Sequence, residues 1–479
     1  MIEQPDADDV IGLAAHELRE GRLQINAGRG CAEIDASPSW LTLLVDGDTL
    51  GLSLAQLDHL ARERLGSSDF MAFVHDLVSQ GLVALHPAGA ARPVVDHFQD
   101  SVRSARAIAR ARLRWPRQPD SEGWGRGPSA AVATARALGE AVERHAFFSP
   151  GSCLRLARGE DVCDREAEPA FVAHLATQYL EPGFPLTRFS LADERCWLPT
   201  ACLRTGATRW IPADAIHPVQ ALPAPGRDRR CAVATSSGFA CAPSLAAAVE
   251  HGLHELIERD AFMRHWLAQR GGIEIARDSL PASVDAVARE LEDAGCAVHL
   301  QCLTLGLAPV WLAIVQHAAL GFTCTGAAAG ANDQDALDRA LAEAHAAAMA
   351  RVATADGAAV SPVDPTAVAN AAGHAALYGD RRYFRRADAL MACRERLPFR
   401  HAAPDGRLRA RTASDVIGAR QSSVIDFSPT SLAFAPGGWQ LHTVRVIVPS
   451  LAPITFGARL LPLAFGAAMP GAAFPHPFS

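Results

Sequence analysis

Residues 137–148 read ALGEAVERHAFF, and residues 253–263 read LHELIERDAFM. Both stretches contain the pattern E-x-x-E-R, and the remaining positions are largely apolar at the spacing of a helix. This internal echo predicts two related Ala-rich helices, over residues 130–147 and 243–268, each with two carboxylates on one face.

The carboxylate pairs are Glu140 with Glu143 and Glu255 with Glu258. Like charges on a mostly buried helix repel each other unless a cation lies between them. The arginine that follows each pair supplies part of that charge, and a divalent metal could supply the rest. For either copy alone, an exposed glutamate pair with a local salt bridge is the alternative.

Four carboxylates that face each other could hold two or more Mg²⁺ ions, which prefer oxygen ligands and phosphate co-ligands. Such a site suits a nucleoside triphosphate. The sequence has neither the Gly-rich loop ending in Gly-Lys-Ser/Thr nor a kinase signature, so the predicted nucleotide site is of an uncommon kind. We predict that the two pairs converge on one cavity.

Composition narrows the class of protein. The chain has 479 residues, is 49% hydrophobic and carries a net charge of −7, which argues against a nucleic-acid or membrane-surface role. Its 11 cysteines form no C-x-x-C pair, as expected of reduced thiols. Neither a signal peptide nor an apolar run of membrane-spanning length is present, so we expect a soluble, cytoplasmic protein.

Residues 1–88 read as a small α+β domain. A strand is predicted over residues 40–45, then a helix capped by Ser53 and a second helix beginning at Asp69. A short strand over residues 82–85 follows a glycine. This order is typical of a winged helix-turn-helix, and its few basic residues favour a peptide or partner protein over DNA as its ligand.

Residues 89–479 form the predicted main domain, entered through a Pro-, Gly- and Arg-rich linker over residues 87–124. Six arginines crowd that linker, on a solvated helix face or at a local anion site: Arg103, Arg106, Arg110, Arg112, Arg114 and Arg117. Beyond it, helices are predicted over 284–294 and 333–353, and strands over 298–303 and 309–315. This alternation indicates a mixed α/β body, and hence an α+β protein.

The echo resembles the YcaO family. In that family the first helix carries S-A-L-G-E-x-x-E-R. The second helix follows the motif N-G-x-A and carries E-L-x-E-R-D-A, with a Trp nearby. The chain reads SSGFA at residues 236–240 and ELIERDAF at 255–262, with Trp266 beyond. It has GRG at 125–127, where the family has G-K-G, and ALDRALAEAH at 336–345 resembles the third family block. The resemblance covers roughly residues 95–479.

The resemblance implies ATP and Mg²⁺ as cofactors, with Glu140, Glu143, Glu255 and Glu258 as the metal ligands. It assigns nucleotide contacts to eight further residues: Arg126, Arg136, Arg144, Ser236, Ser237, Arg259, Glu343 and Arg351. Three of these depart from the family, which has Lys at 126, Ser at 136 and Asn at 237. The glutamine expected after Glu343 is replaced within residues 346–348, and Arg351 keeps a basic group nearby.

The C-terminal sequence FPHPFS resembles the Pro-rich tail of the azoline-forming branch, in which the end of the chain reaches the active site. The resemblance therefore gives Pro475, Pro477 and Ser479 a catalytic role, with Ser479 where a final proline is usual. It implies ATP-dependent cyclodehydration of Cys, Ser or Thr in a ribosomally made precursor peptide. Residues 470–479 are expected to form neither regular helix nor strand.

The resemblance also implies partners: a precursor peptide with a leader, a leader-binding or ubiquitin-activating-enzyme-like protein, and a flavin dehydrogenase, in a homodimer or heteromeric complex. Three histidines near the echo are candidate proton shuttles or merely packed side chains: His145, His251 and His254. Other readings stay open at this point: a non-catalytic YcaO scaffold or partner subunit, a YcaO that makes thioamides or amidines, and a DNA-binding regulator.

Overall fold

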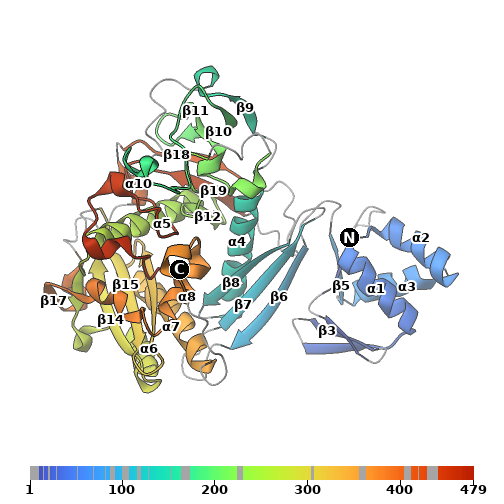
Figure 1. Cartoon of the computed structure of the whole chain (residues 1–479). Coiled ribbons are helices and arrows are strands. Elements are labelled where there is room, and N and C mark those ends of the chain that lie inside the picture. The colour runs from blue at the N-terminus through green and yellow to red at the C-terminus, as the bar shows by residue number, and fades with distance from the viewer. Residues whose placement is uncertain are drawn as a thin grey trace. The chain divides into compact units, whose positions relative to one another are not determined.

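The computed structural model (Figure 1) describes residues 10–478 except 14–15, 20–21, 28–29, 51, 68, 81, 87–91, 100–106, 116–119, 128, 151–152, 163–172, 224–229, 304–306, 355–362, 404–411, 419 and 429–440. Contacts divide the chain into two compact units. Unit 1 comprises Met1–Ala146, Cys241–Leu245 and Ser428–Thr443, and unit 2 comprises Phe147–Ala240, Ala246–Phe427 and Val444–Ser479.

The N-terminal part of unit 1 has a core of its own, built from side chains between Leu23 and Val83. Strand β1 pairs with β5, and β2, β3 and β4 form a separate antiparallel sheet. The elements in chain order are β1 (Val10–Leu13), β2 (His16–Arg19), β3 (Arg22–Ala27), β4 (Gly30–Ile34), α1 (Pro38–Leu50), α2 (Leu54–Leu65), α3 (Asp69–Ser79) and β5 (Val83–His86).

Helix α1 replaces the strand predicted over residues 40–45, so that prediction was wrong. Leu41 and Leu44 are fully buried at a spacing of three, which a helix places on one face. Pro38 is the first helical residue, where a missing N–H costs nothing, and the Ser37 carbonyl accepts the Leu41 N–H at 3.1 Å. A short apolar run fits a strand as well as a buried helix, and the start signals at Ser37 and Pro38 favour the helix.

The two helices that follow are confirmed. Ser53 caps α2 through a capping box with Gln56, and α2 ends at Gly66, whose φ is +63°. Helix α3 begins at Asp69, and β5 comes directly after its C-terminal turn. The winged-helix role and the domain boundary at residue 88 stay predictions.

The prediction of a linker over residues 87–124 was wrong. Most of this stretch forms an antiparallel sheet of β6 (Arg92–Gln99), β7 (Ala107–Arg114) and β8 (Ser121–Gly127). Along β7, partly exposed arginines alternate with fully buried residues, so they occupy one strand face and not a helix face. These arginines are Arg110, Arg112 and Arg114; Arg103, Arg106 and Arg117 lie outside the described residues. Arg110 forms a 2.6 Å salt bridge with Glu122 of β8.

Unit 2 contains a five-stranded sheet in the order β16-β15-β14-β13-β17, antiparallel except for the β13–β17 pair. Helices α6 (Ala282–Asp293) and α7 (Asp333–Ala353) pack on it around Trp311. These bounds confirm the predicted helices and strands of this region to within about two residues at each end. The strands are β13 (Ile273–Ile275), β14 (Ala297–Leu303), β15 (Val310–His317), β16 (Phe322–Ala329) and β17 (Glu395–Leu397).

A second large sheet has the order β11-β10-β18-β19-β12, with β9 also paired to β10. Helix α5 (Leu245–Leu267), which follows β12, carries the second half of the echo. The strands are β9 (Arg155–Arg158), β10 (Glu194–Cys202), β11 (Thr208–Pro212), β12 (Phe239–Ala242), β18 (Ser423–Asp426) and β19 (His442–Ile447). The remaining helices are α4 (Ala130–Phe148), α8 (Ala371–Tyr378), α9 (Phe399–Ala402) and α10 (Ala413–Ile417). The mixed helix and sheet architecture confirms the predicted fold class, and within the described ranges no helix is long and apolar enough to span a membrane.

Candidate active site

Helix α4 in unit 1 presents the first carboxylate pair. Glu140 accepts hydrogen bonds from the backbone N–H of Trp124 at 2.7 Å and from the Arg144 guanidinium at 2.7 Å. Glu143 accepts the backbone N–H of Cys241 at 2.7 Å. Both carboxylates are only partly exposed, so backbone donors and one arginine fix the orientation of the pair before any ligand binds.

Glycines of β8 bring the strand against α4 closely enough for the Trp124 N–H to reach Glu140. A Cβ atom at Gly123 would lie 2.2 Å from the Ala137 carbonyl oxygen, and one at Gly125 would lie 1.9 Å from the Ala133 carbonyl oxygen. No side chain fits there. The glycines of this strand therefore have a packing function that the GRG motif alone did not reveal.

Helix α5 in unit 2 presents the second pair. Glu255 accepts the backbone N–H of Gly238 at 2.6 Å and the Arg259 guanidinium at 3.1 Å. Arg259 also lies 3.3 Å from Glu258, so one guanidinium bridges both members of the pair. The side chain of Glu258 is only 11% exposed. Arg259 thus supplies the part of the positive charge that was expected of it, and the divalent metal stays a prediction.

One arginine does not neutralise the carboxylates around it. The pKa of Glu258 is raised to about 8, chiefly by burial and also by the nearby charges of Glu343 and Glu255, against the opposing effects of Arg259 and Arg339. Glu258 is therefore largely protonated at neutral pH, and a bound cation would favour its ionised form. A buried carboxylate whose ionised form is stabilised by a further cation is a group that Mg²⁺ can bind.

Glu343 is held like Glu140, in a strand–helix unit that repeats. It accepts the backbone N–H of Ala327 at 3.2 Å, next to Gly326, whose Cβ would lie 2.3 Å from the Ala340 carbonyl oxygen. Four residues before it, Arg339 donates to the Ala329 carbonyl at 2.6 Å. The α7 helix therefore fixes its glutamate against β16 in the way that α4 fixes Glu140 against β8.

The matching arginine on α4 is Arg136, which donates to the Arg126 carbonyl at 2.6 Å. The sequence signal for this repeat is the shared string R-A-L-x-E, at residues 136–140 and 339–343. The E-x-x-E-R echo does not extend to α7, so it does not reveal this repeat. Arg136, which departs from the family's serine, thus joins α4 to β8, and its predicted contact with nucleotide stays a prediction.

The turn before β12 supplies the donor for Glu255. Gly238 has φ +80° and a Cβ there would lie 2.5 Å from the Val446 carbonyl oxygen, so only glycine fits. Ser237 is buried and its hydroxyl lies 3.0 Å from the Thr235 hydroxyl, while the Ser236 carbonyl accepts the Phe239 N–H. These serines shape the turn; their binding of nucleotide stays a prediction.

The C-terminal residues up to Phe478 are packed into unit 2. The Pro475 carbonyl accepts the Tyr378 hydroxyl at 2.9 Å, and the Pro477 carbonyl accepts the Thr325 hydroxyl at 3.0 Å. The Arg259 guanidinium lies over the Phe478 ring, 4.6 Å from its centre. The tail thus reaches the α5 carboxylate pair. Pro470–Ala473 form one 3₁₀ turn. Residues 474–478 form neither regular helix nor strand, as expected.

The remaining predicted residues fall into three groups. Ser479 lies outside the described residues. Arg351 donates to the Ala375 carbonyl at 2.6 Å and so joins α7 to α8, which gives it a packing function beside the predicted one. His145 stacks on Trp115 at 3.5 Å, and burial lowers its pKa to about 4, as burial also lowers the pKa of His254. Both histidines are neutral at pH 7.

The side chains of this protein can supply only part of the ligand set of a magnesium ion. Within the described ranges, no three acidic, histidine or cysteine side chains are grouped as a complete metal site. Mg²⁺ commonly uses one or two carboxylates with water and substrate phosphates, and each helix offers such a pair. The pairs belong to different units, so the convergence of all four carboxylates on one cavity stays a prediction.

Comparisons with known proteins agree with this fold. Solved structures that resemble it include a heterocyclase in complex with substrate and cofactor, at 16% identity and TM-score 0.57, covering 80% of this chain and 54% of that one. YcaO from Methanopyrus kandleri, bound with AMPPCP and Mg²⁺, has 16% identity and TM-score 0.52, covering 76% and 86%. The E. coli microcin synthetase McbBCD complex with pro-MccB17 bound has 13% identity and TM-score 0.58, covering 80% and 96%.

The chain thus spans about half the length of the first of these heterocyclases. No curated protein sequence matches it. The sequence profile described as YcaO cyclodehydratase, ATP- and Mg²⁺-binding, matches residues 124–452, which is more than half of the chain. That range contains both carboxylate pairs and the R-A-L-x-E repeat. The chain therefore belongs to the YcaO family, a family that binds ATP and Mg²⁺, as the sequence predicted.

Proposed function

We propose that this protein is an ATP-dependent cyclodehydratase that converts Cys, Ser or Thr residues of a ribosomally made precursor peptide into thiazolines or oxazolines. The observation that carries the proposal is the partly buried Glu255–Glu258 pair around Arg259, in a chain of the YcaO family. Its charge is suited to Mg²⁺ and phosphate and not to an apolar ligand.

The proposed reaction balances without an external oxidant or base. The substrate's thiol or hydroxyl attacks the preceding backbone carbonyl carbon, and the carbonyl oxygen takes the terminal phosphoryl group of ATP. ADP leaves, and phosphate departs with the former carbonyl oxygen as the C=N bond forms. The protons of the amide nitrogen and of the nucleophile pass to the departing phosphate and to water. Mg²⁺ would supply neutralisation of phosphate charge. The protein needs no nucleophile of its own, which agrees with the lack of a recognisable catalytic triad in the sequence.

In this reaction the residues of the protein would orient the bound cation and neutralise the charge of the phosphates. Glu255 and Glu258 on α5, and Glu140 and Glu143 on α4, would hold the cation, each pair pre-oriented by backbone N–H donors. Arg259 would meet phosphate oxygens once the cation displaces it from the carboxylates. The other predicted nucleotide contacts, from Arg126, Arg136, Arg144, Ser236, Ser237, Glu343 and Arg351, belong to the same proposal.

We propose that the C-terminal tail positions the substrate amide at the reaction site. Its position against Arg259 supports a catalytic or positioning role for Pro475, Pro477 and Ser479, because a tail fixed by three buried contacts can hold a substrate amide at a constant distance. Thioamide- or amidine-forming activity is the alternative within the family, and the tail is the feature that favours azoline formation.

The test is mass spectrometry of a Cys/Ser/Thr-rich precursor peptide encoded beside this chain, incubated with the protein and any partner encoded there. We expect the loss of one water per ring, only with both ATP and Mg²⁺. Peptide unchanged while ATP is hydrolysed would contradict the proposal, as would water loss without ATP.

A non-catalytic scaffold is the second candidate function, and it is favoured by the changes from the family's polar residues at Arg136 and Ser237. Calorimetry with Mg-ATP separates the two, because a scaffold needs no nucleotide. Each lost hydrogen bond to phosphate costs about 1.5–3 kcal/mol, or one to two decades of affinity. We expect weakened nucleotide binding that improves with the precursor peptide or a leader-binding partner; a folded protein with no binding under any of these conditions is a scaffold.

A further inference from the structure

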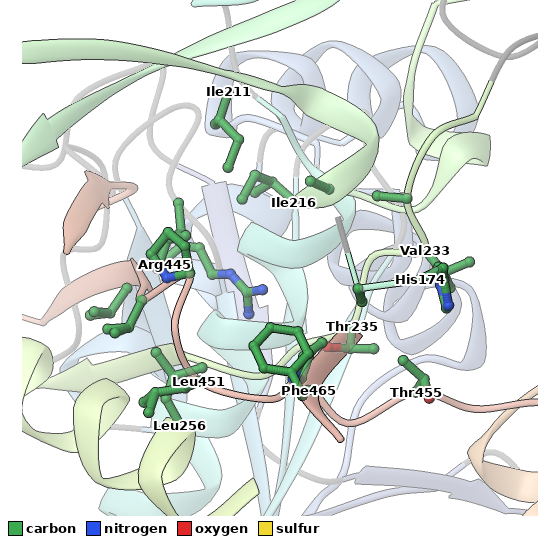
Figure 2. A pocket seen from close by; sticks show the side chains of 18 residues that line it. His174, Ile211, Ile216, Val233, Thr235, Leu256, Arg445, Leu451, Thr455 and Phe465 are labelled. Carbon is green, nitrogen blue, oxygen red and sulfur yellow. The ribbon is translucent and has the colours of Figure 1, made fainter. Parts of the chain in front are cut away.

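The cavity beside helix α5 belongs to the site already described (Figure 2). Leu256 of α5 lines it, and its one charged lining residue is Arg445 of β19. The Arg445 guanidinium lies over the Phe239 ring, 5.2 Å from the ring centre, and the charges of Glu255 and Arg259 act on it. The other lining side chains are mostly apolar. A set of charged groups that the proposed reaction does not use lies elsewhere in unit 2.

The stretch from Asp380 to Arg400 concentrates positive charge in an otherwise acidic chain. It contains seven arginines and only three carboxylates, so its net charge is +4, whereas the whole chain carries −7. All seven arginines are exposed: Arg381, Arg382, Arg385, Arg386, Arg394, Arg396 and Arg400. A positive patch on an acidic protein attracts an anionic partner.

The 3₁₀ helix η9 (Phe384–Met391) carries this stretch across the five-stranded sheet. At its start, the Phe384 carbonyl accepts the Thr323 hydroxyl of β16 at 2.7 Å. Near its end, the Leu390 carbonyl accepts the Gln301 side chain of β14 at 2.7 Å, and β17 follows at the edge of the sheet opposite to β16. The first four arginines of the stretch are therefore grouped near β16, apart from those near β17.

These four arginines form a group that we call the arginine patch: Arg381, Arg382, Arg385 and Arg386. Two of them have a carboxylate partner, since Arg382 lies 2.6 Å from Asp380 and Arg385 lies 3.3 Å from Asp388. Arg381 donates to the Ala319 carbonyl and forms no salt bridge with a described residue. Arg386 forms neither a hydrogen bond nor a salt bridge with any part of the chain that the structure describes. Within the described residues, the patch thus keeps two cations without a carboxylate partner.

Arg386 is held in place while its donors stay available. Its guanidinium lies over the ring of Phe474, 5.1 Å from the ring centre, and the Tyr383 ring packs against the same ring at 5.4 Å. An aromatic face orients a guanidinium and leaves its N–H groups to bind in their own plane. A carboxylate fits that plane, because it accepts two parallel hydrogen bonds from one guanidinium. The patch is therefore suited to carboxylate side chains.

The ring beneath this guanidinium belongs to the C-terminal tail, which runs on to the α5 site. Two residues beyond Phe474, the His476 Nε2 atom lies 2.9 Å from the Thr455 carbonyl oxygen, and Thr455 and Leu256 of α5 line one cavity (Figure 2). A chain extends by at most about 3.6 Å per residue, so the tail from Phe474 to Phe478 spans at most about 14 Å. A peptide that reacts at the α5 site and runs beside the tail would reach the patch about four or five residues away from the reacting residue.

A peptide fits the patch better than a nucleic acid does. The carboxylates of Asp380 and Asp388 interrupt the patch and would repel a continuous row of phosphates. The aromatic residues Tyr383 and Phe384 are only partly exposed, whereas single-stranded nucleic acid stacks its bases on open rings. Separate carboxylates on a flexible peptide avoid both obstacles, because each can reach one arginine.

We propose that the arginine patch binds acidic side chains of the precursor peptide, about four or five residues away from the residue that is cyclised. Arg386 would hold a carboxylate with two parallel hydrogen bonds, and Arg381 and Arg385 would add attraction. The identity of the peptide rests on the proposed function. Binding of an acidic peptide to the patch requires neither ATP nor turnover, so a failure of this proposal and a failure of the proposed reaction are distinguishable.

The test is fluorescence anisotropy of the full chain with two labelled hexapeptides, one of alternating Glu and Ala and one of alternating Gln and Ala. We expect the Glu peptide to bind at least about tenfold more tightly, and the difference to vanish at about 1 M salt, because exposed charges are screened there. Arg386→Gln should weaken binding of the Glu peptide about threefold, and its combination with Arg381→Gln about tenfold, as expected of exposed ion pairs. The matched control is Arg396→Gln: Arg396 is also exposed, but it lies on β17 and pairs with Glu274 at 2.6 Å, so binding should not change.

Three results of this experiment would overturn the proposal. The first is equal binding of the Glu and Gln peptides. The second is equal weakening by Arg386→Gln and Arg396→Gln, because diffuse attraction to the whole stretch would then suffice. The third is tighter binding of a labelled oligothymidylate of the same length than of the Glu peptide, which would identify a nucleic-acid surface.

Steady-state kinetics tests whether the patch serves the precursor. With a precursor peptide that has glutamates four and five residues away from its reacting residue, Arg386→Gln should raise KM about threefold and leave kcat unchanged, because the patch lies away from the reacting atoms. Glutamines at the same positions should remove the difference between wild type and variant. An unchanged KM in a variant that binds the Glu peptide weakly would also overturn the proposal.

Discussion

Replacing Gly123 by alanine should damage the α4 site through the strand that orients Glu140. The new Cβ would lie 2.2 Å from the Ala137 carbonyl oxygen and 2.4 Å from the Ala141 nitrogen, and both are backbone atoms. An ordinary contact needs about 1 Å more, so β8 and α4 must separate by about that distance. Overpacking of this kind costs about 1–3 kcal/mol, and here we expect the upper end because no flexible side chain can yield.

The same displacement should weaken the binding of Mg-ATP, because the 2.7 Å hydrogen bond from Trp124 to Glu140 cannot survive it. We would measure urea denaturation by tryptophan fluorescence and nucleotide affinity by calorimetry. Gly139→Ala on α4 is the matched control: its Cβ would meet only the Cys241 Cβ, at 3.7 Å, and alanine favours the helix by up to about 1 kcal/mol. Stability and affinity equal to the wild type in Gly123→Ala would refute the reasoning.

Three further predictions concern other parts of the protein. Burial raises the pKa of Glu258 from 4.5 to about 8. Between these two pH values the folded protein holds a proton that the unfolded chain has lost. The free energy of unfolding therefore falls as pH rises from 4.5 to about 8, by at most about 5 kcal/mol. Glu258→Gln should flatten that decline in Tm without Mg²⁺; an identical pH profile in wild type and variant would exclude the assignment. Tyr378→Phe removes the hydrogen bond to the Pro475 carbonyl, so it should lower the free energy of unfolding by about 1–3 kcal/mol and slow ring formation. Tyr383→Phe, whose ring packs on Phe474, should do neither. Equal urea midpoints for the two variants would argue against a fixed tail. Deleting residues 1–88 should abolish processing of a leader-bearing peptide and leave the rest folded, and unchanged processing would remove the leader-binding role of this segment.

The long helices and the central strands could be predicted because their periodicity is unambiguous. Helix α7 begins and ends where its Ala-rich pattern does, after Asn332 as a capping residue. Helix α1 could not be assigned from its WLTLLV run alone, because a short apolar run fits a strand and a buried helix equally well. The Ser37-Pro38 start signal distinguishes the two.

The carboxylates of the site could be predicted, but their surroundings could not. The E-x-x-E-R echo identifies Glu255 and Glu258, because paired charges in an apolar helix are conspicuous in a sequence. The donors that orient the carboxylates are backbone N–H groups, of Trp124 and Gly238, which carry no sequence signal of their own. Arg445 was missed for a similar reason: a lone arginine in a strand reads as a surface residue until its burial is known.

The most direct test of ATP-dependent cyclodehydration uses a precursor peptide whose backbone carbonyl oxygen before one Cys, Ser or Thr carries heavy oxygen. If the protein phosphorylates that oxygen, the label should leave with the inorganic phosphate, one labelled phosphate per ring. The Glu255→Gln variant should produce neither ring nor labelled phosphate. Ring formation with the heavy oxygen in water, and none in phosphate, would contradict the account.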